Sequence, residues 1–315
     1  MPKLKFSVVI ITRNRANYLD QAITNLVKQN YPKDNFEIIV VDNNSDDITA
    51  SVVIDLKRNL CDSIQYAFEP EIGMSKARNK GAIVARGEIL VFIDDDAIAS
   101  PNWLDDYCLL YRIFPEIVAA GGRIEPLFQC DRPNWLLDEL LVVLGHLNIS
   151  DKETILSFPD HPFGGNFSVK KEIFIKVGGF IEGIKHCNEE KAFFYKLYLN
   201  NYKVGYSPKA LVYHQIPTSR LRKIFFLKRG IKQGMSNVKV KLLFDPIINL
   251  RFKIKVNRLF MDGLLIFRNI LFCRDKYSFS QFYNLCIQLG ELLGIIMRRF
   301  VKNEYRSYSI KNEAS

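Results

Sequence analysis

Short apolar runs alternate with amphipathic stretches over the first part of the chain. Four runs of mainly β-branched and other apolar residues are typical of buried parallel strands, and they cover residues 6–11, 38–41, 64–68 and 89–93. Apolar residues at helical spacing predict helices between them, around 18–26, after the turn at 42–47 through 59, and over 75–86 with Gly87 as its C-cap. This alternation predicts an α/β fold, with a mainly parallel sheet and helices on both faces.

Acidic residues directly follow two of the predicted strands. Asp42 follows the second strand, and Asp94-Asp95-Asp96 follows the fourth. In open α/β sheets ligands bind beyond the carboxyl ends of the strands. Asp94 and Asp96 stand at i and i+2 and point to the same side, where a hard divalent cation and a bound diphosphate would offset their repulsion. We therefore predict a Mg²⁺ or Mn²⁺ site at Asp94 and Asp96, with a solvated turn or a helix cap as the alternative.

The turn after the first strand argues against a dinucleotide-binding domain. It reads Thr12-Arg13-Asn14-Arg15 and lacks the glycines of a GxGxxG motif, which let a pyrophosphate approach the backbone. The sequence has no Walker loop either. Asp42 allows two interpretations: its carboxylate caps an Asx-turn, or it accepts hydrogen bonds from a nucleobase or ribose.

Five successive blocks of the sequence resemble family 2 glycosyltransferases with the GT-A fold. They extend from about Phe6 to His214 in the right order, and they read SVVIITRNRANYLDQAITNLVKQ, EIIVVDNNSDD, GMSKARNKGAIVARGEILVFIDDDA, PFGGNFSVKKEIFIKVGGF and NEEKAFFYKLYLNNYKVGYSPKALVYH. The resemblance implies a GT-A-type mixed, mainly parallel sheet flanked by helices. It also implies an inverting transfer from a nucleoside-diphosphate sugar, with a UDP-sugar favoured, to an acceptor hydroxyl.

The same resemblance implies the residues of the site. Those expected at or beside the donor nucleotide and sugar are Thr12, Arg13, Asn14, Arg15, Asp42, Asn44, Arg78, Asn79, Asp94, Asp95, Gly165 and Asn166. The expected metal ligands are Asp94, Asp96 and His214. Two of these assignments keep local alternatives, because Gly164-Gly165-Asn166 also reads as a plain turn and His214 as a capping or buried histidine.

The catalytic base falls in the last block. The family usually has Glu-Asp there, with the aspartate as the base, whereas this chain has Asn188-Glu189-Glu190. Glu190 stands at the base position with one extra methylene, a change that moves a carboxylate by about 1 Å and is costly in catalysis. Glu189 is the reserve candidate. Alternatively, the two glutamates simply open a helix, where the helix dipole favours them.

The positive charge is confined to the C-terminal third. Residues 220–315 contain 20 Lys and Arg against 6 Asp and Glu, a net charge of +14, whereas residues 1–219 carry −4. We therefore expect a catalytic domain over 1–219 and a basic, mainly helical extension over 220–315. The amphipathic basic stretch 220–232 suits a membrane surface, or else packs on the catalytic domain. The apolar stretches 259–273 and 282–300 both carry charges, so neither is expected to cross a bilayer.

Further expectations concern location and partners. Six scattered cysteines without a CxxC pair, and an N-terminal apolar run too short for a signal peptide, favour a cytoplasmic protein, peripheral at the inner face of the membrane. The expected acceptor is a glycan or a lipid-linked glycan in cell-surface or exopolysaccharide synthesis. No nucleic acid is expected, because no nucleic-acid-binding module is recognised. The alternatives are a sugar nucleotidyltransferase and a catalytically impaired module that only binds nucleotide sugars.

Overall fold

The chain forms two compact units. The computed structural model describes residues 5–184, 187–244 and 276–298. The larger unit comprises the chain up to residue 131 together with 141–185 and 189–218, and the smaller comprises 132–140, 186–188 and the chain from residue 219 onward. The functional division at residue 219, with catalysis before it and a basic extension after it, stays a prediction.

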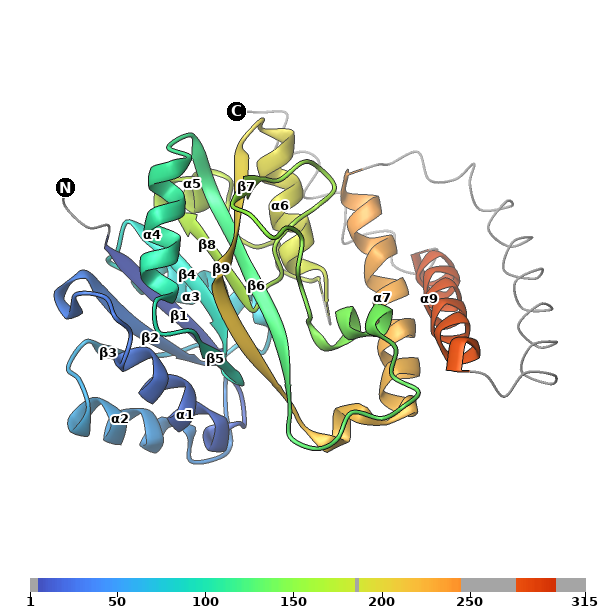
Figure 1. Ribbon diagram of the computed structural model, residues 1–315, viewed down its shortest axis with the longest axis horizontal. Coiled ribbons are helices and arrows are strands. Elements are labelled where there is room, and N and C mark those ends of the chain that lie inside the picture. The colour runs from blue at the N-terminus through green and yellow to red at the C-terminus, as the bar shows by residue number, and fades with distance from the viewer. Residues whose placement is uncertain (1–4, 185–186, 245–275, 299–315) are drawn as a thin grey trace. The chain divides into compact units, whose positions relative to one another are not determined.

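The larger unit is built on a mixed sheet (Figure 1). Four parallel strands form its first part, in the spatial order β3 (Ile64–Phe68), β2 (Phe36–Asp42), β1 (Phe6–Thr12) and β4 (Ile89–Asp94). Thr12 pairs with Asp42, and Ile11 pairs with Asp94. The carboxyl ends of β1, β2 and β4 are therefore level, so the predicted strand-end residues share one edge of the sheet.

Later strands extend this sheet beyond β4. β8 (Asn166–Lys170) pairs antiparallel with β4, and β6 (Ile117–Phe128), β9 (Lys203–Ile216) and β5 (Ala97–Ala99) follow in that order. The short β7 (Thr154–Ile155) also pairs with β9. Since β5 and β9 run antiparallel, Ala97 lies opposite His214. This pairing brings the last block of the sequence next to the aspartates that follow β4.

Helices cover both faces of the sheet, as predicted. α1 (Ala16–Val27), α2 (Thr49–Asn59) and α4 (Trp103–Ile113) pack on one face with alternate strand residues such as Val8 and Ile10. α3 (Met74–Val84), α5 (Lys171–Lys176) and α6 (Glu189–Leu199) pack on the other face, to which Val9 points. The 3₁₀ helices η1 (Lys33–Asn35), η2 (Asp138–Leu144) and η3 (Thr218–Leu221) complete the regular elements of the described residues before α7.

The prediction that Gly87 caps a helix is wrong. α3 ends at Val84, and Ala85 after it is already extended. A Cβ on Gly87 would lie 2.7 Å from the carbonyl carbon of Phe6 and from the nitrogen of Ser7. The chain therefore needs glycine at this point because it passes the start of β1 at close range, and a close backbone approach leaves no local pattern in the sequence.

The smaller unit contains a pair of long helices, α7 (Lys223–Phe244) and α9 (Lys276–Arg298). They approach closely through glycines: a Cβ on Gly234 would lie 2.0 Å from the carbonyl oxygen of Ile287. The apolar stretch 282–300 is helical as far as it is described, and the predicted segment 259–273 lies outside the described residues. In the described part of the chain, every helix is too short or too polar to span a membrane.

Candidate active site

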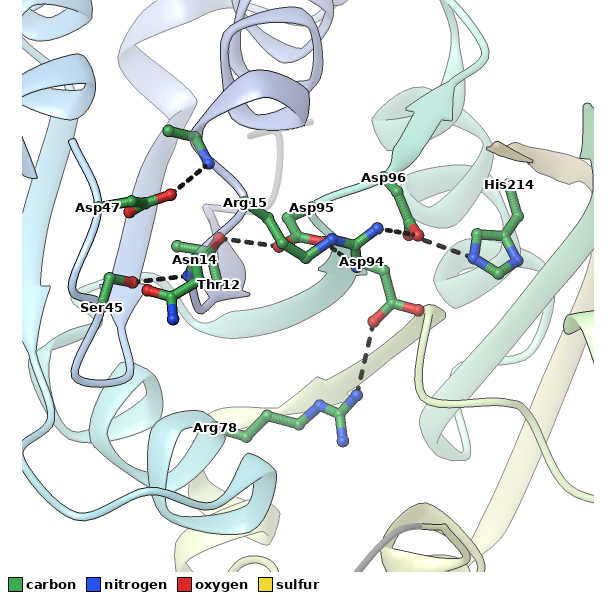
Figure 2. Close-up of polar contacts among 11 residues, drawn as sticks. Thr12, Asn14, Arg15, Ser45, Asp47, Arg78, Asp94, Asp95, Asp96 and His214 are labelled. Atoms are coloured by element: carbon green, nitrogen blue, oxygen red, sulfur yellow. Dashed lines mark hydrogen bonds and ion pairs between the residues drawn. The ribbon is translucent and has the colours of Figure 1, made fainter. Parts of the chain in front are cut away.

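Asp94, Asp96 and His214 come together at the level carboxyl ends of the strands. Asp94 ends β4, Asp96 leads into β5, and His214 lies on β9 beside the pair (Figure 2). One ligand atom of each residue lies within 4.8 Å of the other two. Asp96 is buried and Asp94 is partly exposed, so the group faces outward through Asp94. The structure thus brings together the three residues that were predicted to bind a metal.

The hydrogen bonds of His214 make this group suited to a cation. Its Nδ1 lies 2.7 Å from the carbonyl oxygen of Leu144, and because a carbonyl only accepts, Nδ1 carries the proton. In the neutral ring Nε2 then offers a lone pair, and it lies 3.2 Å from Oδ1 of Asp96. Two acceptors face each other at hydrogen-bond distance, an arrangement that either a proton or a metal ion stabilises. The donor set of two carboxylates and one imidazole suits a divalent cation.

Asp95 faces inward and has different partners. Its Oδ1 lies 2.8 Å from Nη1 of Arg15, and its Oδ2 accepts a 2.8 Å hydrogen bond from the hydroxyl of Thr12. Nη2 of Arg15 also pairs with Oδ2 of Asp96 at 2.5 Å, so Arg15 lies between the two carboxylates (Figure 2). Burial raises the pKa of Asp95 to about 7, although Arg15 acts to lower it. Arg15 is therefore the cation that pairs with both Asp95 and Asp96.

Asp42 caps a turn through its side chain, as one of its two interpretations implies, but the bonded nitrogen lies three residues on and not the two of an Asx-turn. Its Oδ1 accepts a 2.9 Å hydrogen bond from the backbone nitrogen of Ser45, and its Oδ2 accepts one of 2.9 Å from the hydroxyl of Tyr66. The side chain is buried, so it holds the loop after β2. A direct contact between Asp42 and a nucleobase stays a prediction.

Arg13, Asn14 and Asn44 tie the loops after β1 and β2 together. Oδ1 of Asn14 accepts a hydrogen bond of 2.7 Å from the backbone of Asp46, and Nε of Arg13 donates one of 3.3 Å to the carbonyl of Asn44. Asn14 and Asn44 both have left-handed backbones, with φ of 55° and 60°, which asparagine tolerates better than most residues. The two loops therefore form one surface at the strand ends, where the nucleotide was predicted.

Asn79 and Asn166 use their amides inside the protein. Asn79 exchanges two hydrogen bonds with the backbone of Phe180. Oδ1 of Asn166 accepts from the indole of Trp103 and the hydroxyl of Tyr107, and its Nδ2 donates to the carbonyls of Arg123 and Ala210. Four bonds exhaust the capacity of an amide side chain. Only the backbone of Asn166 is therefore left for the predicted contact with the donor sugar.

Glu189 and Glu190 differ in burial although they are neighbours in the first turn of α6. Glu189 is buried, and its Oε1 lies 2.5 Å from Nη1 of Arg78. Glu190 is partly exposed, so it is the better placed of the two to reach a substrate. Arg78 also lies 3.7 Å from Asp94 through Nη2. Burial alone would lower the pKa of Arg78, but Glu189 and Asp94 outweigh it and raise that pKa above its usual value.

Sequence reasoning missed two contributors to the site, and it singled out a third without placing it beside Arg78. Leu144 orients His214 through its carbonyl, Tyr66 binds Asp42, and Gly164 lies against the guanidinium of Arg78. A carbonyl contact leaves no trace in residue type, and Tyr66 looked like an ordinary strand residue. Gly164 had a signal, because two consecutive glycines before a strand often mark a close approach of the backbone.

Comparisons with known proteins agree with this architecture. The family model described as Glycosyl transferase family 2 matches residues 7–178. The chain is 27% identical to the glucosyl-dolichyl phosphate glucuronosyltransferase of Haloferax volcanii over 256 residues, which cover 76% of this chain and 79% of that protein.

Solved structures show the same fold. The mannosyltransferase PcManGT from Pyrobaculum calidifontis, in complex with GDP-Man and Mn²⁺, matches with a TM-score of 0.64 at 17% identity, over 96% of this chain and 89% of that one. S. aureus TarS 1–349 in complex with UDP-GlcNAc matches with a TM-score of 0.55 at 16% identity, over 92% and 91%. The family model covers more than half of the sequence, and the sheet agrees with GT-A glycosyltransferase structures. The chain therefore belongs to glycosyl transferase family 2.

Proposed function

We propose that this protein is an inverting glycosyltransferase that moves a sugar from a nucleoside-diphosphate sugar to an acceptor hydroxyl. The observation that carries the proposal is the convergence of Asp94, Asp96 and His214 within 4.8 Å at the level strand ends of a family 2 glycosyltransferase. In this proposal the three residues hold Mn²⁺ or Mg²⁺. When bound, the metal neutralises charge that builds up on the departing diphosphate.

Manganese is the favoured ion. The imidazole of His214 is a nitrogen donor, whereas Mg²⁺ in proteins is bound almost entirely by oxygen. Two similar structures support the choice, since PcManGT was solved with GDP-Man and Mn²⁺, and GalNAc-T7 with UDP, GalNAc and Mn²⁺. Magnesium is the alternative ion, and a comparison of the two belongs in the binding experiment below.

Glu190 is the proposed base. It takes the proton from the acceptor hydroxyl as that oxygen attacks the anomeric carbon, and a single displacement then inverts the anomeric configuration. Glu190 is partly exposed and lies in the first turn of α6, whereas Glu189 is buried against Arg78. This difference in burial supports Glu190 over Glu189 as the base, because the carboxylate of Glu189 is paired with the guanidinium of Arg78.

The donor and acceptor are proposed by class. A UDP-sugar is the favoured donor and a GDP-sugar the alternative, because similar structures contain UDP-GlcNAc and GDP-Man respectively. A glycan on a lipid carrier is the favoured acceptor, since the similar Haloferax volcanii protein is named for transfer to glucosyl-dolichyl phosphate. A cytoplasmic protein whose basic C-terminal region contacts the inner face of the membrane would meet such an acceptor.

The proposal is tested by separating donor binding from turnover. Calorimetry measures the affinity for UDP and GDP with Mn²⁺, with Mg²⁺ and with EDTA, and a hydrolysis assay follows release of the nucleotide from UDP- and GDP-sugars. We expect Asp96→Ala to abolish metal-dependent nucleotide binding. We expect Glu190→Gln to bind normally and not to turn over. Glu172→Gln is the matched control, because Glu172 is an exposed glutamate in the first turn of α5.

Other outcomes would point to other functions. Wild-type protein that binds a sugar nucleotide without turning it over would be a binding module rather than an enzyme. Formation of a nucleotide sugar from a sugar phosphate and a nucleoside triphosphate would identify a nucleotidyltransferase. Absence of any metal-dependent affinity for UDP, GDP or their sugars would overturn the proposal.

A further inference from the structure

We propose that Arg78 is a positioning residue that ties the first turn of α6 to the end of β4. The inference rests on the proposed function, because it concerns how Glu190 is held relative to Asp94 and Asp96. Arg78 was expected beside the nucleotide. Its side chain is 4% exposed and reaches two carboxylates that belong to different parts of the fold.

The contacts of Arg78 form a continuous charged link. Nη1 lies 2.5 Å from Oε1 of Glu189, the first residue of α6, and Nη2 lies 3.7 Å from Oδ1 of Asp94, the last residue of β4 (Figure 2 draws the contact with Asp94). The guanidinium group is planar and carries several donors in a fixed arrangement, so one arginine can address both carboxylates at once. A lysine offers only a point charge.

Two glycines lie against the ion pair between Arg78 and Asp94. A Cβ on Gly164 would lie 2.8 Å from Nη2 of Arg78, and a Cβ on Gly165 would lie 2.6 Å from Oδ2 of Asp94. Any side chain at either position would push one member of the pair away. The pair of glycines that stood out in the sequence thus lies against both partners of one ion pair. The close packing supports the inference that the position of Arg78 relative to Asp94 is fixed.

Burial makes the link costly to break. Oε2 of Glu189 is buried and has no hydrogen-bond partner within the described part of the chain, so Arg78 provides the pairing recorded for this carboxylate. A buried carboxylate that loses its cation is strongly destabilising. The pair therefore fixes the backbone of Glu189, and with it the starting point of the neighbouring Glu190. A displacement of about 1 Å at a reacting group can cost about 100-fold in rate.

The experiment compares variants that remove the link with and without leaving a buried charge. Arg78→Met/Glu189→Met removes both charges together, so it should fold even if Arg78→Met alone does not. Arg78→Lys keeps a cation beside Glu189 but not the planar fork. Arg86→Met is the matched control, because Arg86 forms an ion pair with Glu37 at the opposite ends of the strands. Each variant is measured for unfolding free energy, for the affinity of Mn²⁺–UDP and Mn²⁺–GDP, and for kcat and KM of donor turnover.

We expect the double variant to fold and to keep its Mn²⁺–nucleotide affinity, while kcat falls about 100-fold with little change in KM. Arg78→Lys should recover part of that kcat, and Arg86→Met should keep the wild-type kcat. A double variant with wild-type kcat would overturn the inference, since the pair would then serve stability alone. So would a parallel loss of nucleotide affinity, which would make Arg78 a donor contact. Wild-type protein without metal-dependent nucleotide affinity would instead overturn the proposed function.

Discussion

Asp95 and Asp96 are neighbours in sequence, but their carboxylates point to different surroundings. Asp95 is buried against Thr12 and Arg15, whereas Asp96 presents Oδ1 to Nε2 of His214. The chain turns at these two residues, between the end of β4 and the start of β5, so their side chains leave the backbone in different directions. The three consecutive aspartates therefore divide into Asp94 and Asp96, which lie with His214 and can bind a metal, and Asp95, which accepts from Thr12 and pairs with Arg15.

This division gives a prediction for two matched substitutions. Asp96→Asn removes a charged metal ligand, and we expect the Mn²⁺-dependent affinity for UDP to fall by more than about 100-fold. Asp95→Asn keeps the shape and an acceptor for Arg15, so we expect a loss of about tenfold or less, transmitted through Arg15. Calorimetric titration of both variants checks the order. Equal losses would show that Asp95 takes part in metal binding.

At the scale of residues, the sequence was a better guide to which residues come together than to what each side chain contacts. The i, i+2 spacing of Asp94 and Asp96 predicted a shared side, the family resemblance added His214, and the structure brings all three together. Asn166 shows the limit. Four hydrogen bonds to α4, β6 and β9 occupy its amide, so its contact with the donor sugar stays a prediction, and one for its backbone alone. Those partners are remote in sequence, so no local pattern could reveal them.

Elements were predictable where periodicity was strong. The four parallel strands and the helices between them follow directly from apolar runs and helical spacing, since burial on one or two faces dictates those patterns. The long pairing of β6 with β9 was not predicted, nor was the glycine contact between α7 and α9. Both depend on two segments that meet only in three dimensions.

At the element scale, Lys196 on α6 gives a prediction on pH. Its ammonium donates to the carbonyls of Val177 and Gly179, in the turn that follows α5, and burial lowers its pKa to about 8 from an ordinary value of 10.5. Between these two values the folded protein has released a proton that the unfolded chain still holds. Stability attributable to Lys196 therefore rises as pH increases through this window.

The test compares wild type with Lys196→Met. The unfolding free energy of wild type minus that of the variant should increase between pH 8 and pH 10.5, and should be constant below pH 8. Urea denaturation across this range measures the difference, in which contributions from other titrating groups cancel. A difference that stays constant throughout would show that Lys196 keeps its ordinary pKa in the folded protein.

The glycines of the α7–α9 pair give a graded prediction. A Cβ on Gly234 would lie 2.0 Å from the carbonyl oxygen of Ile287, whereas a Cβ on Gly294 would lie 3.2 Å from the Cβ of Val238. Gly234→Ala must separate the two backbones, and we expect a destabilisation of about 1–3 kcal/mol. Gly294→Ala also gains about 1 kcal/mol of helix propensity, so we expect little or no loss.

Limited trypsin digestion with mass spectrometry checks this order, because the C-terminal third is rich in lysine and arginine. Cleavage within residues 223–298 should accelerate for Gly234→Ala and stay near the wild-type rate for Gly294→Ala. Equal rates for the two variants would contradict the role of close glycine contact in pairing the helices.

At the scale of the whole molecule, charge is distributed unevenly along the chain. Residues 220–315 carry a net charge of +14, and residues 1–219 carry −4. The smaller unit also exposes an apolar strip on one side of α9, made of Leu289, Leu293, Ile296 and Met297, each at least 38% exposed. Exposed apolar side chains within a basic segment of the chain suit the interface of an anionic membrane, to which each lysine or arginine contributes about 1 kcal/mol.

This combination predicts binding to anionic vesicles that depends on both charge and apolar contact. The full-length protein should cosediment with vesicles of phosphatidylcholine and phosphatidylglycerol, and much less with phosphatidylcholine alone. Raising the salt from about 0.1 M to about 1 M shortens the Debye length from about 10 Å to about 3 Å and should release most of the protein.

The double substitution Leu289→Gln/Leu293→Gln should weaken binding at low salt. The control Ile175→Gln, which changes an exposed apolar residue of α5, should not. Equal binding to neutral and anionic vesicles would remove charge as the cause. If the α9 variant binds as wild type does, the strip has another partner, and the basic residues alone account for attachment.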